Sequence, residues 1–492
     1  MIQQPHHHLS NGHNGHEHVD DHNHQTISIA TTKTTATYGS HGLNGSTTGK
    51  SNGAGSAAIA SQPSQRFIPF IDQSYTNNDS DASARSLILA LRPDWASSDS
   101  HIDFVRFTDG ITNTLLKAVN RRAGLSKDEI DREAILLRAY GHGTDLIIDR
   151  ARETQNHELL MQHGLAPELL ARFNNGMMYR FIRGGVTDPE RLRKREIYLA
   201  VARRLAQWHA TVPCLPGKTH VSEKMEDHAA EILAQTTSGS DETLFKTLQQ
   251  AIDAACPGKQ SPNIWTVMQK WIFALPTDTP AQRERQALLQ GELKKLVAEL
   301  APRPGLGKDS LVFAHCDLLC GNVIVLPESD DISRLDEAAE CVTFIDYEYA
   351  VPSPAAFDIA NHFAEWGGFD CDFTVLPTKS QRHDFIAEYT RTYFSLLPTT
   401  TCLEGSLETA HDIDAEIQKL EVEVDVYRGV PGFYWGIWAL IQATISQIDF
   451  DYASYAEVRL GEYWDWRAEL DGSRQAQGKK MPVREQRWSQ QS

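Results

Sequence analysis

The feature that most constrains the fold is a change of pattern in the first half of the 492-residue chain. Between residues 104 and 182, short apolar runs of strand length alternate with turn signals, and one helical stretch is embedded at 145–163. After the Gly-Gly pair at 184–185 the chain becomes mainly helical. Such a shift is typical of a boundary between two lobes. The pattern therefore predicts an α+β protein with a strand-rich N-terminal lobe and a mainly helical C-terminal lobe.

The two ends of the chain differ from the middle. Residues 1–64 are rich in His, Asn, Gly, Ser and Thr, so burial of apolar groups cannot offset the entropy of ordering them, and we expect a disordered tail. Its histidines could bind a transition metal, but a solvated low-complexity tract is the simpler explanation. We place the N-terminal lobe at 65–183, a hinge near 181–185, the C-terminal lobe at 184–470 and a polar C-terminal tail at 471–492.

Composition excludes some classes of function. The formal net charge of −18 opposes binding to nucleic acid, which depends on clustered Lys and Arg, and it suits a cationic substrate. Seven cysteines, an odd number in so long a chain, predict reduced thiols and a cytoplasmic protein. The apolar run at 433–445 is too short to span a membrane and predicts a buried helix, and the N-terminus lacks the apolar core of a signal peptide.

The segment that carries chemistry is an expected strand, loop and strand at 311–325. Within its loop, Asp317 follows His315 and precedes Asn322 by five residues. This is the spacing of a kinase catalytic loop, in which the Asp meets the substrate hydroxyl and the Asn holds magnesium. A further strand at 341–345 delivers Asp346, where a second metal carboxylate belongs, and Glu348 could add an outer metal contact. The motif alone also fits an ordinary turn, but the order of the surrounding elements favours phosphoryl transfer.

The strand-rich lobe should supply the nucleotide contacts. Arg138 lies on the third expected strand, where kinases keep a phosphate-binding cation, and Glu158 on the following helix could pair with it. The turn that runs from Asp109 to Asn113 would cover the phosphates with its backbone N–H groups. A surface position on the strand is the alternative for Arg138.

Read in order, these motifs resemble the choline/ethanolamine kinase family, and within it the ethanolamine kinases. The matching stretches lie at 107–113, 163–167, 173–176, 315–322, 344–350, 358–363 and 435–442. The resemblance implies a two-lobed protein-kinase-like fold, ATP and Mg²⁺ as cofactors, and Asp317 as the base. It also implies phosphorylation of ethanolamine to phosphoethanolamine, the first step of the CDP-ethanolamine route to phosphatidylethanolamine.

The resemblance further implies a substrate site for an ammonium group among the C-terminal helices. Its residues would act by cation–π contact and carboxylate attraction, and they are Tyr349, Glu365, Trp435, Trp438, Tyr452 and Tyr455. The spacing of three within the Trp pair and within the Tyr pair independently puts each pair on one helix face. Core packing is the alternative role for each of these side chains.

Several alternatives stay open. Leu318-Leu319-Cys320 in the loop and Tyr347 favour ethanolamine over choline, yet a choline kinase, a dual choline/ethanolamine kinase or a relative of the aminoglycoside phosphotransferases would fit the same motifs. A non-catalytic binding protein on a kinase scaffold is the alternative from another class. Cys316 stands where the family usually has Asn. A zinc site at His315, Cys316 and Cys320 lacks a second ligand pair. The oligomeric state cannot be read from the sequence.

Overall fold

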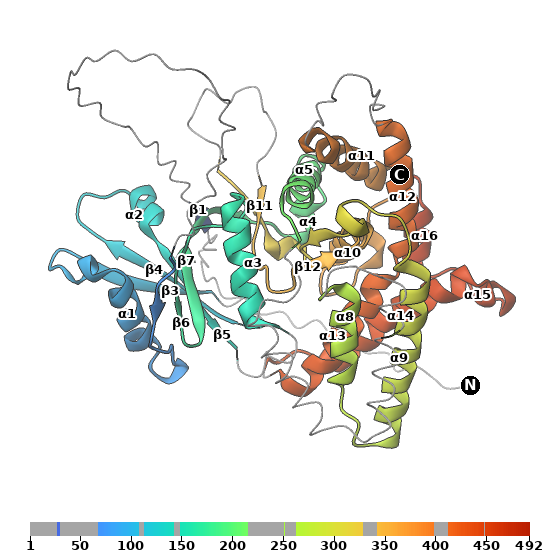
Figure 1. Cartoon of the computed structure of the whole chain (residues 1–492), viewed down its shortest axis with the longest axis horizontal. Coiled ribbons are helices and arrows are strands. Elements are labelled where there is room, and N and C mark those ends of the chain that lie inside the picture. Colours follow the sequence, from blue (N-terminus) through green and yellow to red (C-terminus); the bar gives the residue numbers. More distant parts are fainter. Residues whose placement is uncertain are drawn as a thin grey trace, which may run out of the picture.

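The computed structural model describes residues 27–29, 67–107, 113–141, 148–214, 250, 262–327, 342–397, 412–446 and 448–492. In the described chain, a six-stranded sheet dominates the N-terminal lobe and helices make up most of the C-terminal lobe (Figure 1). This arrangement confirms the predicted α+β class. Asp109, the turn that begins with it and almost all of residues 1–64 lie outside the described residues.

The N-terminal lobe is built on a six-stranded sheet of order β2-β6-β7-β5-β4-β3. Its strands are β2 (Phe70–Ile71), β3 (His101–Phe107), β4 (Asn113–Arg121), β5 (Ile135–Tyr140), β6 (Leu169–Phe173) and β7 (Gly176–Arg180). The expected strands pair across the turn signals between them, β3 with β4 and β6 with β7, and both pairs are antiparallel. The sheet therefore follows from the alternation of apolar runs and turns.

Three helices accompany this sheet. In α1 (Ser80–Leu91), Ala84, Leu87 and Ile88 are buried, the spacing of one apolar face. The embedded helix is α3 (Arg150–Gln162), which begins after its N-cap Asp149. A further helix, α2 (Lys127–Glu133), was not predicted from the apolar pattern. Its start carries a capping box, because the Ser126 hydroxyl accepts the Glu129 N–H while the Glu129 carboxylate accepts the Ser126 N–H. That motif was the signal available.

The lobe boundary is a strand rather than a loop. β8 (Ile182–Val186) pairs with β10 (Val323–Val325), which pairs in turn with β11 (Val342–Phe344). β1 (Ile27–Ile29) adds to the other edge of β8. A Cβ atom on Gly184 would lie 2.4 Å from the Val325 carbonyl oxygen, so only glycine permits this close pairing. The expected hinge is thus hydrogen-bonded to the strand that follows the loop of Asp317.

The C-terminal lobe is a group of helices around one apolar core (Figure 1). Its described helices of four or more residues are α4 (Pro189–Leu192), α5 (Arg195–Thr211), α8 (Ile264–Phe273), α9 (Pro280–Leu300), α10 (Ala355–Ala364), α11 (Lys379–Leu396), α12 (Ile413–Tyr427), α13 (Val430–Ile445), α14 (Tyr452–Leu470), α15 (Ser473–Ala476) and α16 (Val483–Ser489). A two-stranded sheet joins β9 (Val312–Ala314) to β12 (Val351–Ser353). The apolar run at 433–445 lies within α13 and is largely buried, as predicted.

Two glycines bring α13 and α14 close together. A Cβ atom on Gly432 would lie 2.5 Å from the Arg459 carbonyl oxygen, and one on Gly436 would lie 2.6 Å from the Leu460 side chain. The two helices lie close enough for the rings of Trp438 on α13 and Tyr452 on α14 to contact each other. None of the helices that the structure describes has both the length and the apolar character needed to cross a membrane.

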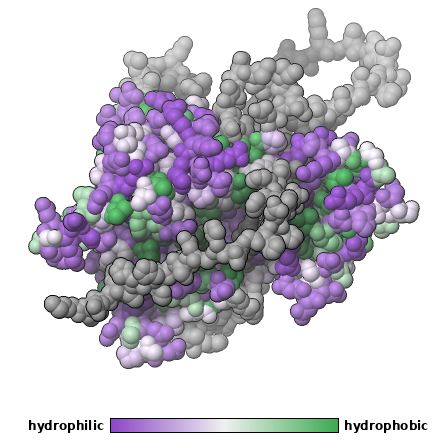
Figure 2. All heavy atoms as spheres, turned by 180° about the vertical axis from the view of Figure 1, so that it is seen from behind, coloured by the Kyte–Doolittle hydropathy of each residue, from purple (hydrophilic) through white to green (hydrophobic). Residues whose placement is uncertain are grey.

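The segment delimited as a polar C-terminal tail contains α15 and α16. Trp488 is only 5% exposed, and the Lys379 N–H donates to the Gln490 carbonyl oxygen at 2.8 Å. The end of the chain is therefore packed onto the helical lobe. On the face that Figure 2 shows, hydrophilic residues cover most of the visible described surface, in line with the high charge.

Candidate active site

Helix α10 holds the loop that connects β9 to β10. The buried Asp358 carboxylate accepts the backbone N–H groups of His315 at 2.9 Å and Cys316 at 2.8 Å. It also contacts Nε2 of His209 at 3.0 Å. Burial opposes the charge of Asp358, but the hydrogen bonds from His209 and from the His315 backbone N–H outweigh burial and lower the pKa of the carboxyl. A charged side chain thus sets the backbone path at the start of the loop.

Two more side chains of α10 bind the same loop. The Asn361 amide donates to the Cys316 carbonyl oxygen at 3.0 Å, and Nδ1 of His362 donates to the Leu318 carbonyl oxygen at 2.8 Å. Together with Asp358 they follow the i, i+3, i+4 spacing of one helix face. The sequence motifs alone give no role to these residues. Three polar side chains on one face of an otherwise apolar helix were the signal that could have found them.

Asp317 and Asn322 lie together, as their spacing predicts. The Asn322 amide nitrogen donates to the Asp317 carbonyl oxygen at 2.8 Å and to its carboxylate at 3.0 Å. Asp317 is 7% exposed. Burial, reinforced by the carboxylates of Asp346, Glu365 and Glu348, raises the pKa of Asp317 well above its usual value. The surroundings of Asp317 therefore favour its protonated form over an isolated negative charge.

Asp346 and Glu348 face the strand-rich lobe. Arg138 of β5 forms ion pairs with both carboxylates, and its Nε lies 3.1 Å from Oε1 of Glu153. Asn113, at the start of β4, donates to Glu348 at 3.0 Å. A pocket lined by Arg138, Glu153 and Asp346, among other residues, opens at this junction. Burial raises the pKa of Asp346, and Arg138 opposes that shift.

The predicted partner of Arg138 was wrong. Glu153, not Glu158, makes the ion pair from α3. The two glutamates are five positions apart, so they point in different directions around the helix, whereas His157 lies one turn from Glu153. The His157 ring contacts those of Tyr179 and Tyr347, with centroids 5.0 Å and 5.6 Å away. Glu158 is only partly buried, and burial raises its pKa while the nearby Arg172 opposes the shift.

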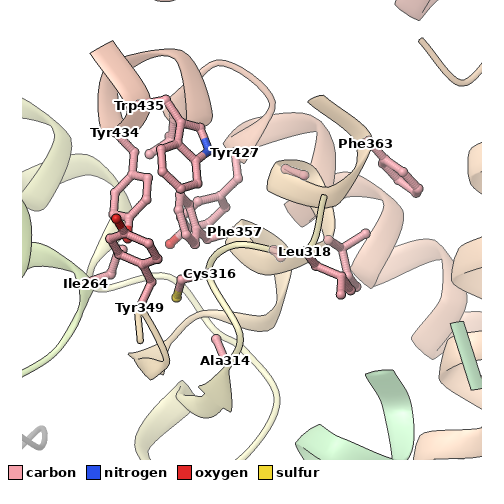
Figure 3. Close-up of a cluster of buried hydrophobic side chains, with 14 of the residues drawn as sticks. Ile264, Ala314, Cys316, Leu318, Tyr349, Phe357, Phe363, Tyr427, Tyr434 and Trp435 are labelled. Atoms are coloured by element: carbon pink, nitrogen blue, oxygen red, sulfur yellow. The ribbon is translucent and has the colours of Figure 1, made fainter. Parts of the chain in front are cut away.

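Four of the aromatic side chains predicted to bind substrate form a cluster. Four rings form a chain of edge-to-face contacts, with centroids 5.7 Å apart for Tyr349 and Trp435, 5.4 Å for Trp435 and Trp438, and 5.8 Å for Trp438 and Tyr452. The Trp438 indole donates to the Tyr349 hydroxyl at 2.8 Å. Figure 3 shows Tyr349 and Trp435 grouped on one side of Cys316. The four aromatic side chains therefore form one connected cluster.

Glu365 and Tyr455 meet at a residue that the sequence analysis did not single out. Arg459 donates to Glu365 at 3.1 Å, and its guanidinium lies over the Tyr455 ring, 5.8 Å from the centroid. Burial raises the pKa of Glu365, with Arg459 opposing the shift. Arg459 stands one helical turn after Tyr455 on α14, so the face shared with Tyr455 was the available signal.

Comparison with known proteins gives a consistent result. Residues 104–464 match the family described as choline/ethanolamine kinase. A probable ethanolamine kinase of Nematostella vectensis is 30% identical over 399 residues, covering 81% of this chain and 96% of the relative. Ethanolamine kinase 1 of Mus musculus is 30% identical, covering 79% of this chain and 89% of the relative.

A solved structure shares the fold. The ethanolamine kinase of Plasmodium vivax superimposes with a TM-score of 0.51 at 22% identity, over 79% of this chain and 89% of that one. The shared fold and the sequence match over residues 104–464 point to the same family. The chain belongs to the choline/ethanolamine kinase family.

Proposed function

We propose that this protein transfers the γ-phosphoryl group of ATP to the hydroxyl of ethanolamine and releases phosphoethanolamine. The observation that carries the proposal is the position of Asp317. Its carboxylate is within electrostatic reach of three others, those of Asp346, Glu365 and Glu348. A phosphate donor beside Asp346 and Glu348 and an ammonium alcohol beside Glu365 would both meet Asp317. Relatives named ethanolamine kinases support the choice of substrate.

Asp317 would act on the substrate alcohol. Its carboxylate would accept a hydrogen bond from the hydroxyl and take the proton as the oxygen attacks phosphorus. The two hydrogen bonds from Asn322 hold Asp317 in place. The raised pKa of Asp317 makes its carboxylate a stronger base than an exposed aspartate, provided that a cation nearby keeps it ionised.

The residues beside Asp317 fit magnesium. Within the described residues no three His, Cys, Asp or Glu side chains form a metal cage by themselves. Mg²⁺ seldom needs such a cage, because it takes one or two protein ligands together with phosphate oxygens and water. We propose that Asn322 and Asp346 hold it, with Glu348 as an outer contact. When bound, Mg²⁺ neutralises charge on the phosphates.

The strand-rich lobe would bind the nucleotide. The Arg138 guanidinium already spans from β5 to Asp346 and Glu348, so it lies where it can also reach a phosphate bound beside them. Asn113 contacts the same Glu348. We further propose that the turn from Asp109 to Asn113 covers the phosphates with its backbone N–H groups.

The aromatic cluster would bind the ammonium group. Rings of Tyr349, Trp435 and Trp438 offer cation–π faces, and Glu365 supplies the opposite charge. Tyr452 belongs to the cluster, and the ring of Phe450, which contacts both Tyr452 and Tyr455, links Tyr455 to it. Choline is the second candidate substrate, because a trimethylammonium group needs aromatic faces and charge but no hydrogen-bond acceptor.

Steady-state assays test these roles. With Mg²⁺ and ATP, ethanolamine should give the highest kcat/KM, followed by choline, with no turnover of an aminoglycoside. Chelation of Mg²⁺ should stop the reaction. Asp317→Asn should lower kcat by roughly 10³-fold, within the range for loss of a general base. Asp414→Asn, an exposed carboxylate at the start of α12, should match the parent. Full activity of Asp317→Asn would refute the proposed base.

We also propose a cytosolic location. The four described cysteines, Cys214, Cys316, Cys320 and Cys371, are all free thiols. Free thiols are typical of a reducing compartment. Cell fractionation should find the kinase activity with cytosolic markers, and recovery of the activity only with membranes or in the medium would contradict this location.

A further inference from the structure

A buried row of alternating charges connects the Glu365 carboxylate to the last helix of the chain. Arg459 lies 3.1 Å from Glu365 and 3.1 Å from Glu462. Arg484, on α16, lies 3.2 Å from Glu462 and 3.1 Å from Glu485. The row continues at Glu485, whose carboxylate is 3.0 Å from Arg428.

This row is shielded from solvent. None of the side chains of Glu365, Arg459, Glu462, Arg484 and Glu485 is more than 7% exposed. Because water and salt screen buried charges poorly, each member influences the next more strongly than a surface pair would. A buried row of ions is also costly to desolvate and is weak evidence of a purely stabilising role.

Helix α16 is fixed in place around the row. The Trp488 indole donates to the Asp425 carboxylate at 2.7 Å, and its ring lies 6.2 Å from that of Phe363, two residues before Glu365. Besides its two ion pairs, Arg484 donates to the Arg428 carbonyl oxygen. The far end of the row is therefore fixed by packing and hydrogen bonds as well as by charge.

We propose that Glu462 and Arg484 are positioning residues that set the affinity of the site for the substrate ammonium by controlling how strongly Arg459 neutralises Glu365. The inference rests on the proposed role of Glu365. Arg459 is shared between Glu365 and Glu462, so any gain in its attraction to one carboxylate weakens its hold on the other. Arg484 competes with Arg459 for Glu462 in the same way.

The alternation gives the two residues opposite effects. Without the Glu462 charge, Arg459 pairs with Glu365 alone, and the carboxylate attracts the ammonium less. Without the Arg484 charge, Glu462 draws Arg459 away and leaves Glu365 more negative. Glu462→Gln should therefore raise the KM for ethanolamine and Arg484→Gln should lower it. The size should be about threefold to tenfold, as expected for charges near the site at an effective dielectric constant of about 20.

The measurement is the KM for ethanolamine, with the KM for ATP and the melting temperature recorded for each variant of the full chain. Arg484→Lys keeps the charge and should retain the parental KM. The double variant Glu462→Gln/Arg484→Gln should also return toward the parental value, since the two effects cancel. Asp465→Asn removes a carboxylate from the same helix, at a half-exposed pair with Arg474, and should change nothing. If Glu462 and Arg484 had only structural roles, their replacement would change the melting temperature but would not shift the KM for ethanolamine in opposite directions.

Glu365→Gln separates the two levels of the proposal. It should raise the KM for ethanolamine more than Glu462→Gln does. A parental KM in Glu365→Gln would overturn the ammonium site and the present inference together. A raised KM in Glu365→Gln, with Glu462→Gln and Arg484→Gln shifting KM in the same direction or not at all, would overturn the present inference alone.

Discussion

His315 joins Asp317 to Ile345, the residue that precedes Asp346. Nε2 of His315 contacts the Ile345 carbonyl oxygen at 3.0 Å, and the Asp317 N–H donates to Nδ1 at 3.3 Å. A carbonyl only accepts and an N–H only donates, so the imidazole is neutral with its proton on Nε2. Burial favours the same form and lowers the pKa of His315 to about 4. One side chain thus sets the spacing between the proposed base and a proposed metal ligand.

Replacing His315 should slow chemistry more than it weakens binding. In His315→Gln a flexible amide cannot reproduce both bonds at the imidazole spacing. The backbone at Asp317 and the backbone before Asp346 are then no longer held at a fixed distance by one side chain. We expect kcat to fall on the order of 10²-fold, the cost of a misplacement of about 1 Å, with little change in either KM. Steady-state kinetics on His315→Gln test this. His383→Gln, on the exposed face of α11, is the matched control. An unchanged kcat would mean that the loop holds its geometry without the imidazole.

Cys316 adopts a left-handed backbone conformation, with φ of 62°. Asn and Gly accept this region more readily than a β-branched residue, for which it is a strained outlier. We expect Cys316→Asn and Cys316→Gly to retain activity and Cys316→Val to lose about 2 kcal/mol of stability, the upper end of the left-handed penalty. Denaturant unfolding of the three variants measures whether the Val variant has the lowest free energy of unfolding. Equal stability of the Val and Asn variants would refute the backbone argument.

The buried histidines predict sensitivity to acid. Nδ1 of His362 donates to the Leu318 carbonyl oxygen, and the Trp366 indole donates to its Nε2 at 3.3 Å, so the folded protein needs the neutral ring. Burial lowers the pKa of His362 to about 4 from an ordinary value of 6.5. The unfolded chain therefore takes up a proton below pH 6.5 that the folded chain refuses. This stabilising contribution is complete above pH 6.5 and is lost as the pH falls toward 4.

A variant isolates this effect from other titrating groups. His362→Gln should be less stable than the parent at pH 7, because it loses hydrogen bonds. Its stability should fall less steeply with acid, by about 1.4 kcal/mol per pH unit near pH 5, which corresponds to one proton. Denaturant unfolding at pH 5, 6 and 7 gives both slopes. Parallel slopes would show that His362 is already protonated in the folded protein.

Removing Arg138 should affect both stability and nucleotide binding. Arg138→Met leaves Glu153, Asp346 and Glu348 without their shared cation, and unpairing a buried charge costs roughly 3–5 kcal/mol. The KM for ATP should rise while the KM for ethanolamine stays near the parental value. Arg138→Lys should recover only part of the lost stability and of the lost affinity for ATP, since an ammonium cannot span three carboxylates. Arg172→Met, exposed on β6, is the control. A parental KM for ATP in a folded Arg138→Met protein would refute the phosphate role.

Local patterns predicted the elements well. Both hairpins of the strand-rich lobe and the buried helix α13 follow from apolar periodicity and turn residues, which act over a few positions. The contact between Asp317 and Asn322 was likewise predictable, because a short loop brings both ends together. The short helix α2 was missed because its seven residues show little periodicity and only the capping box marks it.

Contacts between distant segments were harder to predict. Choosing between Glu153 and Glu158 required the rotation of α3 relative to β5, which the spacing along one helix does not define. Arg459 meets Glu365 across 94 positions, and nothing near either residue in the chain indicates the other. The same holds for Trp488, whose burial depends on a surface formed by α10 and α12.

The strand at the lobe boundary has a mechanical consequence. Since β8 is hydrogen-bonded to β10, and β10 starts at the residue after Asn322, rotation of one lobe against the other displaces the backbone beside that amide. Gly184 allows this close pairing, because a side chain at its position would collide with the Val325 carbonyl oxygen of β10. Closing around a nucleotide and aligning Asn322, the proposed magnesium ligand, would then be a single movement of the chain.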